Sequence, residues 1–226
     1  MRLLAILLIS ASAYSAANAQ ISDNLVRIGV LGDLSGVYAD FGGPGNVVAA
    51  RMAVEDVGGK VLGKPIDVVA ADHQSKADIG AAIARQWFDA DKVDMAIGFD
   101  NSSVALAVEQ VALQKNRIAI AGAVATTAFT GKNCTPNEAA WLHDTYAVSN
   151  TLARSVVGRG GDTWFFITVD YTFGHSLETE AKSAVLASGG KVLGAVRHPL
   201  NNPDLSSCRR RLRERRLSHW LMLAAT

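Results

Sequence analysis

Short β-rich runs alternate with amphipathic helical segments along most of this 226-residue chain. Most of the runs are near-continuously apolar, as expected for strands that are covered on both faces. The segments between them space their apolar residues three and four apart, which is typical of helices with one buried side. This alternation predicts an α/β fold with a doubly wound parallel sheet. The predicted strands are Val26–Leu31, Ile66–Ala70, Val93–Ile97, Ile118–Ala121, Trp164–Val169 and Lys191–Val196.

The alternation lapses around residues 131–149 and then resumes with a helix at Asn150–Val157. Four β/α units precede the lapse and fresh units follow it, which predicts two lobes, residues 20–145 and 146–207, joined by a crossing segment. The second lobe has two predicted strands, fewer than the five or six of an average sheet. We therefore expect an incomplete second lobe with uncovered apolar faces, and poor solubility and weakened ligand binding for this chain by itself.

The two ends of the chain differ from its body. Residues 1–19 combine one early cation, an apolar run too short to span a bilayer, and the small-residue ending Ala17-Asn18-Ala19, which predicts a cleaved secretory signal peptide. Residues 208–226 form an anomalous tail with six arginines and one glutamate. The tail is either a basic arm for nucleic acid or anionic lipid, or the product of a shifted reading frame, and we favour the second interpretation.

Charge, cysteines and motifs exclude several function classes. The formal net charge of +1 gives no electrostatic argument for a nucleic-acid partner. Cys134 and Cys208 make neither a disulfide scaffold nor a zinc site. The segment 174–178 lacks the closing glycine of a nucleophile elbow, and the sequence has no phosphate-binding loop. We therefore expect no enzymatic activity, no cofactor and no metal.

Polar loops follow four of the predicted strands, at 32–43, 98–103, 122–127 and 170–174. In parallel α/β sheets, ligands bind beyond the carboxyl ends of the strands. These loops mix glycine with hydroxyl-bearing and aromatic residues and lead toward helix starts, where free N–H groups can bind a carboxylate without a lysine or arginine. One such loop would be an ordinary turn or helix cap, and Ser102 or Ser103 is a candidate cap. Four at equivalent positions predict a binding cleft.

Several motifs resemble the branched-chain amino-acid-type periplasmic binding proteins of ABC importers. The resemblance covers about residues 26–207 and ends where the arginine-rich run begins, which favours a truncated or frame-shifted product because chains of that family are usually much longer. Its motifs are Ile28–Leu31 with Asp33–Gly36, Ala49–Asp56 with Gly58-Gly59, Gly63–Ile66, Asn101–Ser103 and Tyr171–His175.

The resemblance implies a clamshell of two Rossmann-like lobes that closes on a small solute in the periplasm and presents it to a permease in the inner membrane. Such receptors usually act as monomers. The implied ligand-binding residues are, by position, Phe41, Asn101, Ser102, Ser103, Ala123, Ala125, Thr126, Asp144, Tyr146 and Phe173. A ligand carboxylate would be held by the N–H and hydroxyl groups of Ser102, Ala123, Ala125 and Thr126.

The ligand stays open between an amino acid and an aromatic or aliphatic acid. Asp100-Asn101 and Val124-Ala125 depart from the residues usual in amino-acid receptors. The motif Tyr171–Glu178 is similar to the branch of the family that binds other carboxylates. The alternative function is an extracytoplasmic ligand-sensing domain that reports to a signalling or regulatory partner.

Overall fold

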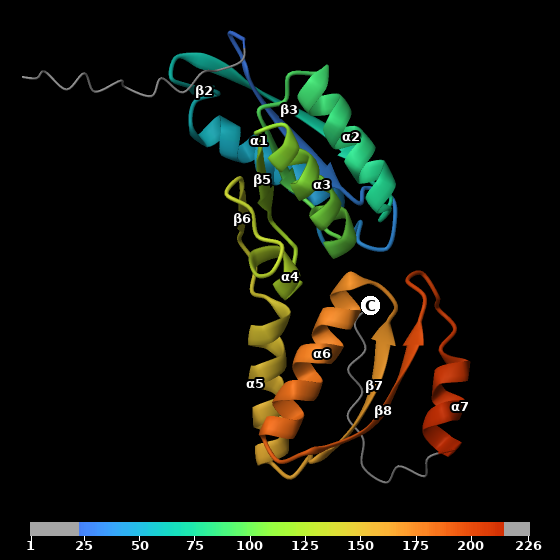
Figure 1. The fold of residues 1–226 in the computed structure, drawn as a ribbon. Helices are drawn as coiled ribbons and strands as arrows, with labels where there is room; N and C mark the ends of the chain where they lie inside the picture. Colours follow the sequence, from blue (N-terminus) through green and yellow to red (C-terminus); the bar gives the residue numbers. More distant parts are fainter. Residues whose placement is uncertain (1–22, 215–226) are drawn as a thin grey trace, which may run out of the picture.

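The computed structural model describes residues 23–214. Two lobes lie end to end, and each is built on its own β-sheet (Figure 1). The predicted signal peptide at 1–19, and the part of the predicted tail beyond Glu214, lie outside the described residues. Within the described range, no helix combines the length and the apolar character that crossing a membrane requires.

The first lobe contains a six-stranded sheet in the order β2-β3-β1-β4-β5-β6. All neighbouring strands pair in parallel except β2 and β3, which form an antiparallel hairpin. The parallel sheet predicted from the alternating pattern is therefore confirmed. The strands are β1 (Val26–Gly32), β2 (Lys60–Val61), β3 (Lys64–Asp72), β4 (Met95–Gly98), β5 (Ile118–Ala121) and β6 (Glu138–Ala140).

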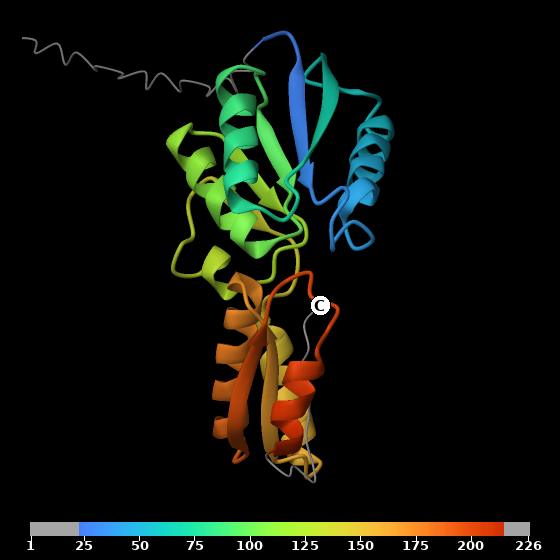
Figure 2. The ribbon, with the colours of Figure 1, turned by 90° about the vertical axis from the view of Figure 1, so that its right-hand side faces the viewer.

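Helices cover the two faces of this sheet unequally. Helices α2 (Ala77–Asp89) and α3 (Ser102–Gln114) lie side by side on one face, while α1 (Gly43–Asp56) lies on the other (Figure 2). The core forms under α2 and α3, where Leu31, Trp87 and Phe99 are buried. The short helix α4 (Thr127–Thr130) follows β5 at the end of the sheet nearest the second lobe.

The second lobe contains the parallel strands β7 (Thr163–Val169) and β8 (Lys191–His198). Helices α5 (Thr145–Gly158) and α6 (Thr172–Ala187) pack on one side, and α7 (Ser206–Glu214) contacts β8 from the other (Figure 2). The expectation of an uncovered second sheet is wrong for β7, because every residue from Trp164 to Val169 is buried. The start of the arginine-rich segment forms part of α7, in which Cys208 is buried.

Two helix starts differ from the sequence-based expectation. Helix α5 begins at Thr145 rather than Asn150, because the Asp144 carboxylate accepts a hydrogen bond from the Ala147 N–H and caps the helix. Helix α3 is capped by Asn101, not by a serine: the Asn101 Oδ1 accepts hydrogen bonds from the N–H groups of Ser103 and Val104. Both caps are short polar side chains directly before an apolar helical run.

Candidate ligand-binding site

The first wall of the site is the loop 33–42 after β1, which is folded around the carboxylate of Asp33. This fully buried carboxylate accepts hydrogen bonds from the N–H groups of Gly36 and Tyr38, at 3.0 and 3.1 Å, and from the Ser75 hydroxyl at 2.8 Å. The short polar side chain thus fixes its own following turn. The turn brings Tyr38 and Phe41 to the gap between the lobes.

Two further aspartates hold the same loop from neighbouring strands. Asp72, at the end of β3, accepts from the Leu34 N–H at 3.1 Å and the Ser35 hydroxyl at 2.5 Å. Burial tends to raise the pKa of Asp72, but these hydrogen bonds lower it below its ordinary value. Asp100, after β4, accepts from the Asp33 N–H and from the Asn46 amide. Its burial raises the pKa of the Asp100 carboxyl despite these two hydrogen bonds.

Glycine is required where the loop passes Asp100. A Cβ atom on Gly42 would lie 2.1 Å from the Asp100 Oδ1 atom, so any larger residue would displace the carboxylate. Gly98, the last residue of β4, adopts φ +109°, and a Cβ there would lie 2.8 Å from the Leu31 carbonyl oxygen. These two glycines allow the loops after β1 and β4 to approach each other at the sheet edge.

The loop after β5 provides N–H groups that an anionic ligand can use. Among residues 23–214, the N–H groups of Ala123 and Ala125 have no hydrogen-bond acceptor. The Ser102 side chain lies beside them at the start of α3 and is buried. Free N–H groups near a helix start favour negative charge.

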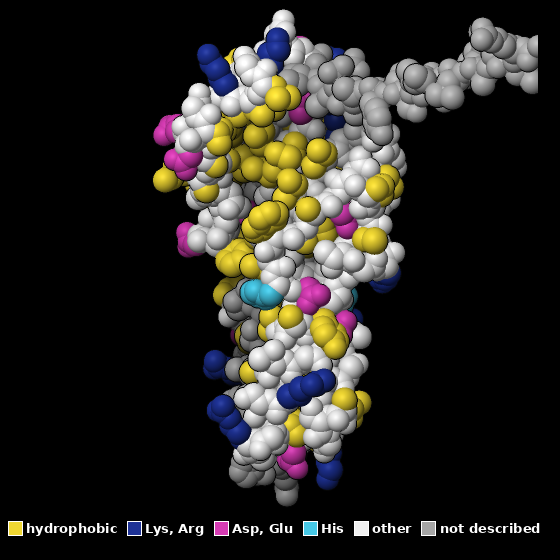
Figure 3. All heavy atoms as spheres, turned by 90° about the vertical axis from the view of Figure 1, so that its left-hand side faces the viewer, with side chains coloured by type: hydrophobic (Ala, Val, Ile, Leu, Met, Phe, Trp, Pro, Cys, Tyr) yellow, Lys and Arg dark blue, Asp and Glu magenta, His cyan; other side chains and the backbone are white. Residues whose placement is uncertain are grey.

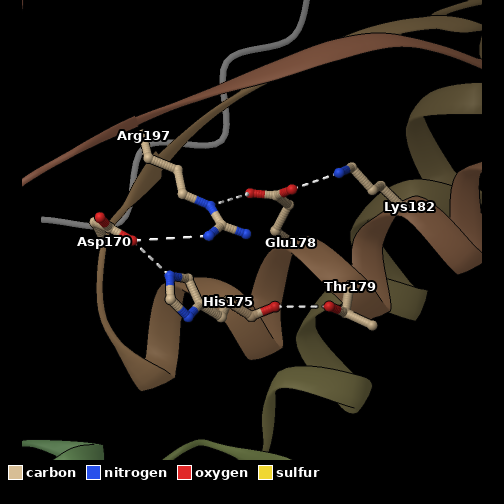
Figure 4. Close-up of polar contacts among 6 residues, drawn as sticks. All are labelled: Asp170, His175, Glu178, Thr179, Lys182 and Arg197. Carbon is tan, nitrogen blue, oxygen red and sulfur yellow. Dashed lines mark hydrogen bonds and ion pairs between the residues drawn. The ribbon is translucent and has the colours of Figure 1, made fainter.

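The second wall is the start of α6, which carries Tyr171 and Phe173. A polar network anchors this helix to the ends of β7 and β8 (Figure 4). Asp170 lies 2.7 Å from His175 Nε2 and 3.8 Å from the guanidinium of Arg197. The Glu178 carboxylate lies 3.7 Å from Arg197 Nε and also pairs with Lys182. Burial tends to raise the pKa of Glu178, but the Lys182 hydrogen bond and the cationic neighbours lower it.

Hydroxyl groups join the two walls. The Tyr38 and Tyr171 hydroxyls lie 2.5 Å apart, and the Ser103 and Thr172 hydroxyls lie 2.8 Å apart. Burial is the main cause that raises the pKa of both tyrosines. Further along the seam, the Ser176 hydroxyl on α6 lies 3.1 Å from the Thr127 hydroxyl on α4 of the first lobe. The two lobes are therefore in contact through these hydroxyl groups.

A cavity of about 350 Å³ lies between these walls. Four aromatic rings line it, two from each wall, and the ring centroids of Tyr38 and Tyr171 are 6.4 Å apart. None of the described residues that line the cavity is a lysine or arginine. The lining residues are Tyr38, Phe41, Asp100, Ser102, Ala123, Ala125, Leu142, His143, Thr145, Val148, Tyr171, Phe173 and Leu177.

The structure brings half of the predicted ligand-binding residues to this cavity: Phe41, Ser102, Ala123, Ala125 and Phe173. Thr126 and Asp144 line a different cavity behind Leu142 and His143, and each caps a helix. The remaining three predicted residues line neither of these two cavities. Asn101 caps α3, Ser103 bonds to Thr172 across the seam, and Tyr146 lies on the exposed side of α5.

Sequence inspection did not name several lining residues. Tyr38, Asp100 and Tyr171 belong to the polar loops that predicted the cleft, and the aromatic content of those loops could have indicated the two tyrosines. Leu142, Thr145 and Val148 come from the crossing segment and the start of α5, where no periodic pattern marks an inward-facing side chain.

Comparison with known proteins places this fold and cavity in a family. The family described as "Periplasmic binding protein" matches residues 25–223. The match extends beyond residues 26–207, which the sequence motifs cover. A periplasmic binding protein from Burkholderia mallei has a similar structure, with 44% identity, a TM-score of 0.86 and coverage of 89% of this chain and 54% of that chain.

Two other solved structures are similar at lower identity. A branched chain amino acid ABC transporter periplasmic ligand-binding protein from Burkholderia xenovorans LB400 is 34% identical, with a TM-score of 0.73 and coverage of 89% and 54% of the two chains. An ABC transporter solute binding protein from Rhodopseudomonas palustris HaA2, in complex with p-hydroxybenzoic acid, is 26% identical, with a TM-score of 0.76 and coverage of 88% and 54%.

Curated relatives are also similar to this chain in sequence. A Leu/Ile/Val-binding protein homolog from Brucella abortus (strain 2308) is 27% identical over 200 residues, which are 88% of this chain and 50% of that protein. The chain thus spans about half the length of the curated relatives that it matches. The family match, the two-lobed α/β fold and the interlobe cavity agree: this chain belongs to the periplasmic binding protein family.

Proposed function

We propose that this protein is the solute-binding component of an ABC importer, which binds a small carboxylate-bearing molecule between its lobes in the periplasm and presents it to a permease in the inner membrane. One observation carries this proposal: the cavity is built from both lobes, with two aromatic rings from each. A ligand that contacts both walls stabilises the closed arrangement, and a permease can recognise that arrangement.

The carboxylate would bind in the first lobe, between the loop after β5 and the start of α3. The free N–H groups of Ala123 and Ala125 and the Ser102 hydroxyl supply donors there without a cation. Hydrogen bonds from N–H groups to an ionised carboxylate are stronger than neutral ones, so three donors can hold it. The absence of lysine and arginine from the described lining favours this neutral mode of binding.

The rest of the cavity favours an aromatic acid over an amino acid. The rings of Tyr38, Phe41, Tyr171 and Phe173 form an apolar chamber that suits a benzene ring. An amino acid also needs a partner for its ammonium group, and Asp100 is the one lining carboxylate among the described residues. Both Asp100 oxygens already accept hydrogen bonds from the first lobe. A relative of 26% identity was solved with p-hydroxybenzoic acid.

Thermal unfolding and isothermal titration with benzoate, 4-hydroxybenzoate and L-leucine test this proposal. Binding raises the unfolding temperature in proportion to the logarithm of ligand concentration. We expect the two aromatic acids to raise it and leucine to leave it unchanged. The variant Phe173→Ala should weaken binding at least about tenfold, because it removes one of the four aromatic rings that line the chamber. Trp141→Ala is the matched control, because Trp141 is 83% exposed and does not line the cavity.

The outcomes separate the ligand class from the function. A rise in unfolding temperature with leucine and none with the benzoates would support the solute-binding function but contradict the aromatic-acid ligand. No shift with any small carboxylate, or equal losses in Phe173→Ala and Trp141→Ala, would contradict binding in this cavity. Reduced uptake of the bound acid by cells that lack the gene would support delivery to a permease.

A further inference from the structure

Asp100 lies at the same edge of the first-lobe sheet as the donors proposed for the ligand carboxylate. Strands β4 and β5 pair in parallel with Gly98 opposite Ala121, and the Gly122 N–H donates to the Gly98 carbonyl at 2.9 Å. Asp100 and Ala123 follow these paired residues by two positions each, and both line the cavity. Because neighbouring strands lie about 5 Å apart, a carboxylate bound at the Ala123 N–H group lies next to the Asp100 carboxyl group.

The Asp100 carboxyl group is held in one position beside the cavity. A Cβ atom on Gly42 would lie 2.1 Å from Asp100 Oδ1, and one on Gly32 would lie 3.0 Å from Oδ2. The Asp33 N–H donates to Oδ2 at 3.0 Å, and the Asn46 amide donates to Oδ1 at 2.9 Å. Asp100 is also only 4% exposed. The carboxyl group therefore cannot turn away from an approaching ligand into bulk water.

An ionised Asp100 would repel an anionic ligand in this cavity. Within the described part of the chain, no lysine or arginine lines the cavity, so no such cation offsets a second negative charge. The fully buried Asp33 carboxylate adds negative charge behind Asp100. Like charges repel more strongly in a buried site than in water, and salt screens them less. A bound carboxylate therefore favours the neutral form of the carboxyl group beside it.

Among the aspartates at this end of the sheet, Asp100 is the one placed to take up a proton. Burial, and to a lesser extent the Asp33 charge, raises the pKa of Asp100 despite its two hydrogen bonds. Burial tends to raise the pKa of Asp72 as well, but its hydrogen bonds lower it. Asp33 and Asp72 do not line the cavity, and α1 presents the uncharged Asn46 to Asp100.

The other titratable groups nearby supply no fixed positive charge. His73 is fully buried, its Nδ1 accepts from the Ser75 N–H at 3.0 Å, and burial lowers its pKa, so the ring is neutral. Burial raises the pKa of Tyr38 and of Tyr171, so both hydroxyls are neutral. His143 lines the cavity from the crossing segment and is exposed. Figure 3 shows a histidine side chain at the surface where the two lobes meet.

We propose that Asp100 takes up one proton from solution when an anionic ligand binds in the cavity, so that the acid and the proton bind and leave together. This inference rests on the proposed function, because it requires a carboxylate at the N–H groups of Ala123 and Ala125. A neutral carboxyl group removes one of two adjacent negative charges. Its oxygens can still accept the hydrogen bonds from Asp33 and Asn46.

The coupling has a definite direction. Above the pKa of Asp100 in the free protein, each bound ligand must bring a proton with it, so affinity rises as the pH falls. The increase is at most about tenfold per pH unit, which is the limit for one coupled proton. Below that pKa the proton is already bound in the free protein, and the dependence on pH ends.

Isothermal titration of the purified protein with benzoate, between about pH 5.5 and 8, tests this proposal, because benzoate itself stays ionised there. Titrations in buffers of different ionisation enthalpy give the number of protons taken up per ligand. We expect net proton uptake and an affinity that rises as the pH falls.

Two variants assign the proton to its group. Asp100→Asn removes the ionisable group and keeps an oxygen acceptor, and the Asn46 amide can turn to accept from the new NH2 group. This variant should bind benzoate without proton uptake, and several-fold more tightly than the wild type at about pH 8. Asp40→Asn is the matched control, because Asp40 is exposed in the same loop and does not line the cavity. It should keep the proton uptake of the wild type.

Circular dichroism shows whether each variant is folded, and the proton count of the wild type needs no variant. Benzoate binding without proton uptake at every pH would overturn this inference but not the proposed function. Uptake that persists in Asp100→Asn would overturn it too, and would assign the proton to another group such as His143. So would binding of L-leucine but not benzoate, because an ammonium group favours ionised Asp100. If benzoate, 4-hydroxybenzoate and L-leucine all fail to bind, the proposed function fails and this inference fails with it.

Discussion

The two walls of the cavity are held in place by different kinds of polar contact. Buried carboxylates hold the first wall, and Asp33 accepts from backbone N–H groups with no exposed surface of its own. Half-exposed contacts among Asp170, His175 and Arg197 hold the outer edge of the second wall, beside the buried carboxylate of Glu178 (Figure 4). Hydrogen bonds in a buried site are costly to break, whereas exposed ion pairs contribute little. We therefore expect the outer edge of the second wall to tolerate the loss of its polar contacts better than the first wall does.

The largest predicted effect is the loss of the Asp33 carboxylate. Asp33→Ala leaves the Gly36 and Tyr38 N–H groups and the Ser75 hydroxyl without their acceptor. We expect a loss of roughly 3 kcal/mol or more in the free energy of unfolding, measured by urea denaturation. Asp170→Ala, the corresponding change at the second wall, is the control. Equal losses in the two variants would remove the difference between the walls.

The second prediction concerns pH and a carboxyl pair behind the first wall. Glu109 on α3 is fully buried next to Glu138 on β6, the strand that leads to the lining residue His143. Burial, with the nearby Glu138 carboxyl, raises the pKa of Glu109 from 4.5 to about 8. The folded protein therefore retains a proton that the unfolded chain loses.

The sign of the effect follows from this raised pKa. The stabilising contribution of protonated Glu109 is complete below about pH 4.5 and is lost as the pH rises toward about 8. We expect Glu109→Gln to reduce this loss when urea denaturation is measured across the same pH range. Glu55→Gln, on the exposed side of α1, should follow the wild-type profile. If the free energy of unfolding of Glu109→Gln depends on pH in the same way as that of the wild type, the raised pKa of Glu109 is contradicted.

The helices and strands of the structure show which elements the sequence can predict and which it cannot. The regular alternation predicted the strands well, and β5 has the predicted bounds, Ile118–Ala121. The strands β2 and β6 were missed, because two or three residues are too short for a periodic signal. The start of α5 was misplaced, because its cap Asp144 lies in the segment where the alternation lapses.

At the site, the loops could be predicted but the direction of their side chains could not. Phe41 and Phe173 were placed by resemblance, while Tyr38 lies inward because Asp33 folds its own turn, which is a tertiary detail. Asp144 and Tyr146 were assigned by position along the chain. The helix that begins between them turns one into a cap and leaves the other exposed.

The third prediction concerns the hydroxyl pair that joins the walls. Tyr38→Phe or Tyr171→Phe leaves the other hydroxyl without its partner in a half-buried site, at a cost of roughly 1–2 kcal/mol. The double variant should cost less than the sum of the single variants, because no hydroxyl is then left unpaired. A double-mutant cycle of urea denaturation measures the difference. Strictly additive losses would show that the hydroxyls do not interact across the seam.

The smallest predicted effect is that of salt on the second wall. Asp170→Ala removes the carboxylate that His175 and Arg197 share, but all three side chains are roughly half exposed, so we expect a loss below about 1 kcal/mol. Because salt screens exposed charges, high sodium chloride should abolish most of this difference between Asp170→Ala and the wild type. The loss in Asp33→Ala should persist at the same salt concentration, because it comes from buried hydrogen bonds rather than from screened charge. A loss in Asp170→Ala that persists at high salt would contradict this difference between the walls. The start of α6 would then be held as firmly as the loop after β1, and Phe173 would have one fixed position in the cavity.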